Sequence, residues 1–139
     1  MDEKYIDERL EPKIKWHNEK SIRSKNKHYT LKTIEITCAL LIIPIVTFED
    51  DVFKYLAMLF SFIVASLAAL QELFKFKKTW ILCRNTYEKL CSEKAKYYSN
   101  AQPYNNENAD EAFVLNIEKI LTEEHSEWTT LQRQKSKPN

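Results

Sequence analysis

The side chains that could do catalytic chemistry are few in this sequence and widely spaced. His125 follows Glu123 and Glu124, but this spacing matches neither a zinc-protease helix nor a paired general acid and base. Cys83 and Cys91 belong to an odd set of three cysteines without a CxxC pair, which signals neither a disulfide framework nor a zinc site. The sequence therefore predicts no enzyme, no cofactor and no metal centre.

Two acidic residues lie at the borders of long apolar segments. Glu35 lies inside the first segment and Glu72 near the end of the second, so a hairpin would bring the two acids to similar depths. An ionisable residue inside a membrane is energetically costly, so an acid at such a position predicts a functional role. The alternative is that Glu35, close to the boundary, only pairs with Lys32 or with a lysine after the second segment.

Small residues recur at intervals of four along one side of the second apolar segment: Ala57, Ser61, Ala65 and Ala69. Small side chains let helix backbones approach closely in lipid. This face joins either the two helices of one hairpin or separate subunits around an axis, and both interpretations stay open.

A neighbouring strip of small and mildly polar residues ends in an acid: Ser61, Ala65, Ala68 and Glu72. If several copies surrounded an axis, this strip could line an ion pathway.

The elements that must position these residues are two apolar helices. Residues 33–48 and 55–70 are apolar almost all round, and a sixteen-residue helix rises about 24 Å, so flanking residues extend each span toward the ~30 Å hydrocarbon core. The competing interpretation is a buried hairpin in a soluble bundle. It is disfavoured because the remaining chain is too charged to wrap such a hairpin. We expect a transmembrane hairpin over 33–74, with spans at 33–48 and 55–74 and an outer loop at 49–54.

Charge placement predicts the orientation of this hairpin. Lysines and arginines gather before the first span and after the second, whereas the loop is acidic, so both termini are expected in the cytoplasm. The loop acids are also expected to cap the second helix. A net charge of +1 gives no reason to expect nucleic acid as a partner. The absence of glycine removes Gly-rich phosphate loops and favours an all-α chain.

The N-terminal arm, residues 1–32, is expected to hold a long helix from Pro12 after a short turn at 5–10. Along this helix and into the first span, one seam at alternating spacings of three and four excludes every lysine and arginine, so it should face protein. Its members are Ile14, His17, Ser21, Ser24, His28, Leu31, Glu35 and Cys38.

The cytoplasmic part, residues 75–133, is expected to contain helices at 75–99 and 110–132. The first should continue the second span without a break past Trp80, because no breaker occurs before residue 99. The second should begin at an Asp110 cap and pack one apolar face: Phe113, Ile117, Ile120, Leu121, Glu124, Trp128 and Leu131. The tail at 134–139 is expected to be disordered.

The order and spacing of several residues resemble the SLATT family of two-transmembrane proteins, including members known only as domains of unknown function. The matching residues run from Tyr5 to Leu131 and include Trp16, the set Trp80, Arg84, Glu88 and Glu93, then Pro103-Tyr104, and Glu124-His125 with Trp128. His17 departs from the pattern, since an aromatic residue is expected there. We expect a structural network among Trp16, Trp80, Arg84, Glu88, Glu93, Tyr104, Glu124 and Trp128.

The resemblance implies a bacterial membrane protein, with members proposed as pore-forming effectors in conflict systems that sense nucleotide signals. This chain has no fused sensor domain, so a separate sensor protein would supply the trigger. The leading hypothesis is a homo-oligomer in the plasma membrane that forms an ion channel. The alternative is a non-conducting membrane scaffold whose cytoplasmic bundle binds a soluble partner.

Overall fold

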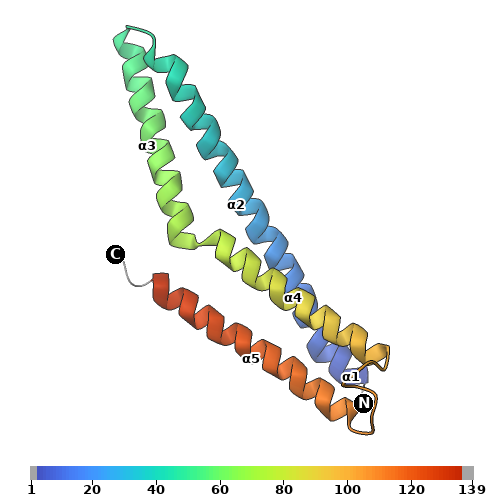
Figure 1. Cartoon of the computed structure of the whole chain (residues 1–139). Helices are drawn as coiled ribbons and strands as arrows, with labels where there is room; N and C mark the ends of the chain where they lie inside the picture. Colours follow the sequence, from blue (N-terminus) through green and yellow to red (C-terminus); the bar gives the residue numbers. More distant parts are fainter. Residues whose placement is uncertain (1–2, 136–139) are drawn as a thin grey trace. The chain divides into compact units, whose positions relative to one another are not determined.

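The computed structural model describes residues 3–135, which form helices joined by turns. Within this range there is no strand, so the predicted all-α fold is confirmed. The elements are α1 (Glu3–Tyr5), the π-helix η1 (Ile6–Leu10), α2 (Glu11–Val46), α3 (Asp51–Phe74), α4 (Phe76–Tyr98) and α5 (Ala109–Lys135) (Figure 1).

The chain divides into two units. The bundle unit comprises the described residues of 1–23 and 78–139, and the hairpin unit is residues 24–77. The bundle unit therefore contains the start of α2, nearly all of α4 and all of α5. The hairpin unit contains the rest of α2 and all of α3.

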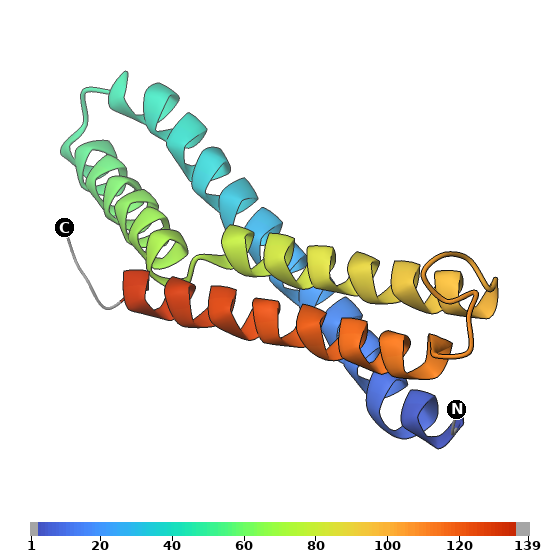
Figure 2. The same ribbon diagram turned by 60° about the horizontal axis from the view of Figure 1, so that its bottom comes forward.

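The bundle unit has a small apolar core. Helices α4 and α5 run antiparallel beside each other (Figure 2), and the N-terminal helices close the core against them. The rings of Tyr97 and Phe113 lie 4.4 Å apart, and those of Tyr104 and Phe113 lie 5.6 Å apart, edge to face. The core residues are Ile6, Leu10, Ile14, Leu90, Tyr104, Phe113 and Ile117.

The seam predicted along α2 is the least exposed face of that helix. Its first four members, from Ile14 to Ser24, are buried, and its last four, from His28 to Cys38, are half-buried. The predicted inner face of α5 is likewise buried or half-buried throughout. Both predictions are confirmed, because helical periodicity decides which side chains face the neighbouring helix.

The hairpin unit pairs the second part of α2 with α3. Most of the less exposed residues of α3 recur at spacings of three and four, and Gln71 at the end of this series donates a hydrogen bond to Glu35 of α2. The series is Phe53, Ala57, Phe60, Val64, Leu67 and Gln71. Large apolar side chains on the remaining faces are open, with Val52 73% and Phe62 71% exposed.

The structure corrects the prediction of an unbroken helix from the second span to residue 99. Helix α3 ends at Phe74 and α4 begins at Phe76, because Lys75 adopts the left-handed conformation, with φ 49° and ψ 41°. This conformation costs about 1–2 kcal/mol for a residue with a Cβ, so local helix propensity cannot signal it. Packing of α3 and α4 in different units accompanies the break.

Three predicted helix ends also shift. The N-terminal turn at 5–10 is a π-helix that buries Ile6 and Leu10, not an isolated turn. Helix α5 starts at Ala109, so Asp110 lies in its first turn rather than at the cap. At the other end α5 includes Gln134 and Lys135, and the rest of the predicted disordered tail lies outside the described residues.

The loop between α2 and α3 covers residues 47–50 and not the predicted 49–54, because α2 ends at Val46, two residues before the predicted end of the first span, and α3 already begins at Asp51. Asp50 occupies the N-cap position of α3 but makes no side-chain capping bond, so the predicted cap is wrong in this respect. Instead Asp51 pairs with Lys54 at 3.0 Å within the first turn.

Candidate functional site

A buried polar cluster in the bundle unit joins α2 to α5. At its centre is His17, whose side chain is 1% exposed and sits on the buried seam of α2. Its Nδ1 lies 2.6 Å from the carbonyl oxygen of Lys13, and its Nε2 lies 2.9 Å from Oε2 of Glu124. The distance to Glu124 is within ion-pair range, but this contact does not have the geometry of a hydrogen bond, and Nε2 has no hydrogen-bond partner among the described residues.

Glu124 is held from both sides in this cluster. Trp128 Nε1, one turn further along α5, donates a 2.7 Å hydrogen bond to its Oε1. Burial alone would raise the pKa of Glu124, but His17, Trp128 and the nearby Lys20 together outweigh burial and lower it. Glu124 is therefore an anion at neutral pH, enclosed by cationic and N–H groups.

The cluster is completed by a lysine between two indole rings. The ammonium of Lys20 lies 4.2 Å from the ring centre of Trp16 and 4.2 Å from that of Trp128, a distance at which cation–π attraction operates. The Trp16 ring also meets the His17 ring edge to face at 4.8 Å. We call these five residues, Trp16, His17, Lys20, Glu124 and Trp128, the His17 clasp.

Cys83 of α4 lies close to Lys20 and Glu124 of the clasp, but its thiol is not activated as a nucleophile. Its side chain is fully buried, and this burial raises the pKa of the thiol to about 11, although Lys20 acts in the opposite direction. Because the thiolate is the reactive form of cysteine, the neutral thiol is suited to packing. The predicted packing role agrees with this geometry.

A second polar cluster lies where the 99–108 loop meets α4 and α5. Tyr104 donates a short hydrogen bond to Glu93, and Asn116 donates one of 2.8 Å to the Tyr104 hydroxyl. Lys96 pairs with Glu93 at 2.7 Å. Burial opposes it, but Lys96 and Tyr104 lower the pKa of Glu93 on balance.

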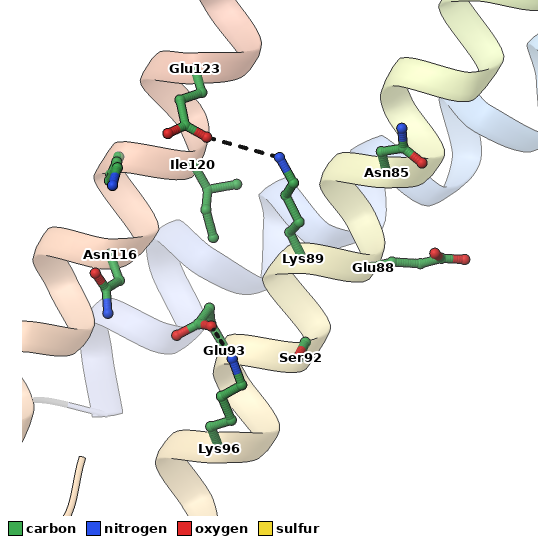
Figure 3. A pocket seen from close by; sticks show the side chains of 10 residues that line it. Asn85, Glu88, Lys89, Ser92, Glu93, Lys96, Asn116, Ile120 and Glu123 are labelled. Atoms are coloured by element: carbon green, nitrogen blue, oxygen red, sulfur yellow. Dashed lines mark hydrogen bonds and ion pairs between the residues drawn. The ribbon is translucent and has the colours of Figure 1, made fainter. Parts of the chain in front are cut away.

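A polar groove of about 560 Å³ lies beside this second cluster, between α4 and α5 (Figure 3). Lysines and glutamates of both helices line it in near balance, and Lys89 faces Glu123 across it at 3.9 Å. The lining residues are Asn85, Glu88, Lys89, Ser92, Glu93, Lys96, Asn116, Lys119, Ile120 and Glu123.

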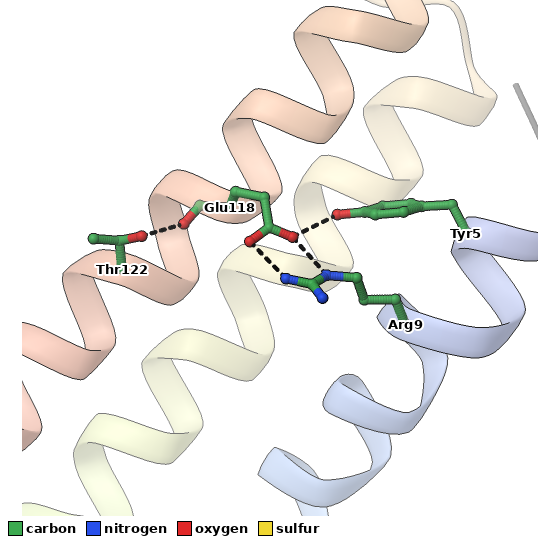
Figure 4. A network of polar contacts seen from close by, with 4 residues as sticks. All are labelled: Tyr5, Arg9, Glu118 and Thr122. Atoms are coloured by element: carbon green, nitrogen blue, oxygen red, sulfur yellow. Dashed lines mark hydrogen bonds and ion pairs between the residues drawn. The ribbon is translucent and has the colours of Figure 1, made fainter.

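A third cluster fixes the N-terminal helices to α5. The carboxylate of Glu118 accepts hydrogen bonds from Arg9 Nε at 2.7 Å, Arg9 Nη2 at 2.9 Å and the Tyr5 hydroxyl at 3.0 Å (Figure 4). The hydrogen bonds from Arg9 are the main reason that the pKa of Glu118 is lowered. Thr122 donates to the backbone carbonyl of Glu118 at 2.8 Å.

The eight residues predicted as one cytoplasmic network lie in separate groups. Trp16, Glu124 and Trp128 belong to the His17 clasp, whereas Glu93 and Tyr104 form the second cluster. The remaining three follow one another along α4: Trp80, Arg84 and Glu88. In that series the Arg84 and Glu88 side chains pair with each other at 2.7 Å on an exposed face, as expected for residues four apart.

The two acids of the hairpin unit have different surroundings. Glu35 pairs with Lys32 at 3.0 Å and accepts a 2.5 Å hydrogen bond from Gln71, so both of its oxygens are engaged. This geometry corresponds to the simple pairing alternative. Glu72, the next residue after Gln71, is exposed.

The small-residue face of α3 is only partly used by the hairpin. Ala57 is buried, and its carbonyl accepts a 2.8 Å hydrogen bond from the Ser61 hydroxyl. The other predicted members are exposed: Ser61, Ala65, Ala68, Ala69 and Glu72. The hairpin contact therefore uses the adjacent face of α3, and most of the small residues point away from it.

Residues 12–112 match the model of a family described as protein of unknown function (DUF4231). The chain belongs to the DUF4231 family. The matched part contains the hairpin and α4, whereas Glu118, Glu124 and Trp128 lie beyond it. No curated protein and no solved structure matches the chain.

Two helical stretches of this DUF4231 chain, Ile6–Val46 and Asp51–Tyr98, are long and apolar enough to cross a membrane. In their most apolar windows, 0% and 6% of the residues are buried within the chain. A core helix of a soluble protein would bury such a window.

Sequence reasoning missed the central parts of two clusters. The sequence places His17 on the protein-facing seam but gives it no polar partner, and Lys20 is one basic residue among many, although Lys20 follows Trp16 by one helical turn. Glu118 carried no signal, because its partners Tyr5 and Arg9 are more than 100 residues away along the chain.

Proposed function

We propose that this DUF4231 protein is a plasma-membrane protein whose hairpin unit crosses the bilayer with both chain ends in the cytoplasm. The supporting observation is that α3 exposes large apolar side chains such as Val52, Phe62 and Leu59, each more than half exposed. At about 25 cal/mol per Å², leaving such side chains in water is costly, and lipid removes that cost. Lysines on the cytoplasmic side, among them Lys32 and Lys75, reach toward the headgroups.

Within the membrane, the protein assembles as a homo-oligomer that conducts ions. The observation that carries this proposal is the exposed face of Ser61, Ala65, Ala68 and Glu72 beside the face that α3 uses for its own hairpin. Small side chains permit close approach of a second hairpin in lipid. A ring of copies would place hydroxyls and a terminal acid along a central path.

Matched substitutions on α3 test this proposal. Ser61→Leu puts a bulky side chain on the exposed small face, whereas Ser66→Leu makes the same change about 140° away around the helix, at 100° per residue. We expect wild type and Ser66→Leu to run as oligomers in mild detergent and to raise ion flux in vesicles. Ser61→Leu should lose assembly or flux. A monomeric, electrically silent wild-type protein would overturn the proposal.

The resemblance to the SLATT family supports a role as an effector in a bacterial conflict system, triggered by a separate sensor protein. Co-expression provides the test. Flux or growth arrest should appear only when the candidate sensor and its signal are present, and constitutive flux without any partner would argue against a separate trigger.

A non-conducting scaffold is the second candidate. It is favoured by a largely apolar groove of about 350 Å³ between α4 and α5, which Ile81, Leu82 and Leu131 line together with polar residues such as Lys78 and Glu127. A stable soluble partner that is lost with Ile81→Asp, together with silent bilayers, would select this function over the channel.

A further inference from the structure

We propose that one end of the hairpin unit binds the headgroups of anionic phospholipids in preference to those of zwitterionic ones. This lipid preference rests on the proposed insertion of the hairpin into the membrane, and it does not depend on whether the protein conducts ions. The binding groups are five lysines, which we call the basic collar: Lys25, Lys27, Lys32, Lys75 and Lys77.

The collar brings together two segments that are far apart in the sequence. Gln71 of α3 donates a hydrogen bond to Glu35 of α2, so these two residues lie at the same level of the hairpin. Lys32 lies about one turn before Glu35, and Lys75 about one turn after Gln71. Because the two helices run antiparallel (Figure 1), both steps lead toward the same end of the hairpin. The collar lysines therefore gather at that end.

Much of the collar charge is not neutralised by the chain itself. Lys32 pairs with Glu35 at 3.0 Å. By contrast, Lys27, Lys75 and Lys77 are not paired with any carboxylate within residues 3–135. Lys27 and Lys77 are exposed, and Lys75 is half-buried. An ammonium group is a donor of three hydrogen bonds and never an acceptor, so these lysines suit the acceptor oxygens of a phosphate.

Aromatic rings lie at the same end of the hairpin as the collar. Phe74 and Phe76 flank Lys75 in the chain, and their rings stack with centres 5.3 Å apart. Tyr29 lies between the collar lysines of α2 and is 53% exposed. Tyrosine rings are enriched at the level of the headgroups. Apolar rings beside ammonium groups therefore match the boundary between acyl chains and phosphates.

The other end of the hairpin carries the opposite charge. Glu49, Asp50 and Asp51 follow one another there, and Asp51 pairs with Lys54 at 3.0 Å. Helix α3 has 24 residues and rises about 36 Å, slightly more than the ~30 Å hydrocarbon core, so its ends reach the two headgroup regions. Carboxylates repel an anionic headgroup, whereas ammonium groups attract it. Anionic lipid should therefore collect around the collar and not around the loop.

Spin-labelled lipids in vesicles that contain the full-length protein provide the test. A motionally restricted component of spin-labelled phosphatidylcholine reports that the hairpin contacts lipid. The ratio of the association constants of phosphatidylglycerol and phosphatidylcholine reports the headgroup preference. We expect phosphatidylglycerol to be favoured about fivefold at low salt, the preference that about one lysine near an anionic surface supplies. The preference should disappear at about 1 M salt, where charges are screened within about 3 Å.

A triple variant of the unpaired collar lysines locates the effect. Lys27→Gln, Lys75→Gln and Lys77→Gln together should reduce the preference to below about twofold, because the paired Lys32 and its neighbour Lys25 remain. The restricted component of phosphatidylcholine should stay unchanged, since no apolar side chain is altered.

The matched control removes three exposed lysines of the bundle unit. Lys4→Gln, Lys13→Gln and Lys15→Gln change the net charge by the same amount and should retain the preference of the wild type. Equal loss in both triple variants would assign the preference to net charge and overturn the role of the collar. A wild type that restricts phosphatidylcholine but shows no preference for phosphatidylglycerol would also overturn it, while leaving membrane insertion intact. If neither lipid shows a restricted component, the proposed membrane function fails as well.

Discussion

The bundle unit and the hairpin unit satisfy their side chains in opposite ways. In the bundle unit the large residues Phe113, Ile117 and Leu90 are fully buried by the unit's own helices. In the hairpin unit the apolar residues Val52 and Phe62 remain more than 70% exposed. Internal packing therefore stabilises the bundle unit, whereas the hairpin unit leaves much of its apolar surface uncovered by the chain itself.

Polar groups follow the same division. The bundle unit connects distant parts of the chain through three clusters around His17, Tyr104 and Glu118, so its polar contacts define which helices meet. In the hairpin unit, Gln71 of α3 donates a hydrogen bond to Glu35 of α2. The rest of the less exposed face of α3 is mainly apolar and includes Ala57, Phe60 and Val64.

The largest expected effect separates the two units by the same substitution. Phe113→Ala empties a fully buried site and should lower the free energy of unfolding by about 3–5 kcal/mol. Phe62→Ala removes a ring that is 71% exposed in the chain, so the free energy of unfolding should fall much less. Thermal unfolding of both variants in the same detergent measures the difference. Equal losses would mean that Phe62 is buried by a contact that the single chain does not contain.

The helix faces of both units could be predicted from the sequence. The seam from Ile14 to Cys38 and the inner face of α5 were predicted from periodicity alone, because burial on a helix repeats every three or four residues. The all-α class followed from the apolar runs and the absence of glycine. The family match over residues 12–112 adds membership of a family of unknown function.

The contacts between distant segments could not be predicted in this way. The pairs Arg9–Glu118 and His17–Glu124 join residues more than 100 positions apart, and a single sequence gives no measure of which charged residues meet. The break at Lys75 was missed because it opposes local propensity.

The next largest effect on stability is expected at Lys75, the left-handed residue that follows the end of α3. Lys75→Gly removes the Cβ that disfavours φ 49°, so it should raise the free energy of unfolding by about 1 kcal/mol. Lys77→Gly, the same change inside α4, should lower it by a similar amount. Chemical unfolding compares the two. A loss of stability in both variants would indicate that residue 75 is helical in solution.

Glu118 tests how strongly the N-terminal helices are fixed to the bundle unit. Glu118→Gln should lower the free energy of unfolding by about 1 kcal/mol at pH 7. The loss is small because the Glu118 side chain is 38% exposed, so solvent screens its charge. The pKa of Glu118 is lowered in the folded state, so its contribution is present at neutral pH and is lost as the pH falls through that lowered value. The melting temperatures of wild type and variant should therefore converge at low pH. Glu111→Gln, which changes an exposed carboxylate two turns before Glu118 on α5, is the control. If the difference in melting temperature stays constant down to pH 3, the loss of stability comes from packing and not from charge.

The smallest effect concerns the hydrogen bond between Gln71 and Glu35 across the hairpin. A double-mutant cycle of Glu35→Leu and Gln71→Leu should give a coupling energy of about 0.6 kcal/mol, the average for hydrogen bonds between membrane helices. The value is small because the partners find other contacts when separated, and Glu35 keeps Lys32. Glu72→Leu, paired with Glu35→Leu, is the control and should show no coupling, since Glu72 is exposed and outside the hairpin contact. Coupling between Glu35 and Glu72 would instead mean that Glu72 faces α2, which requires a rotation of α3 about its own axis.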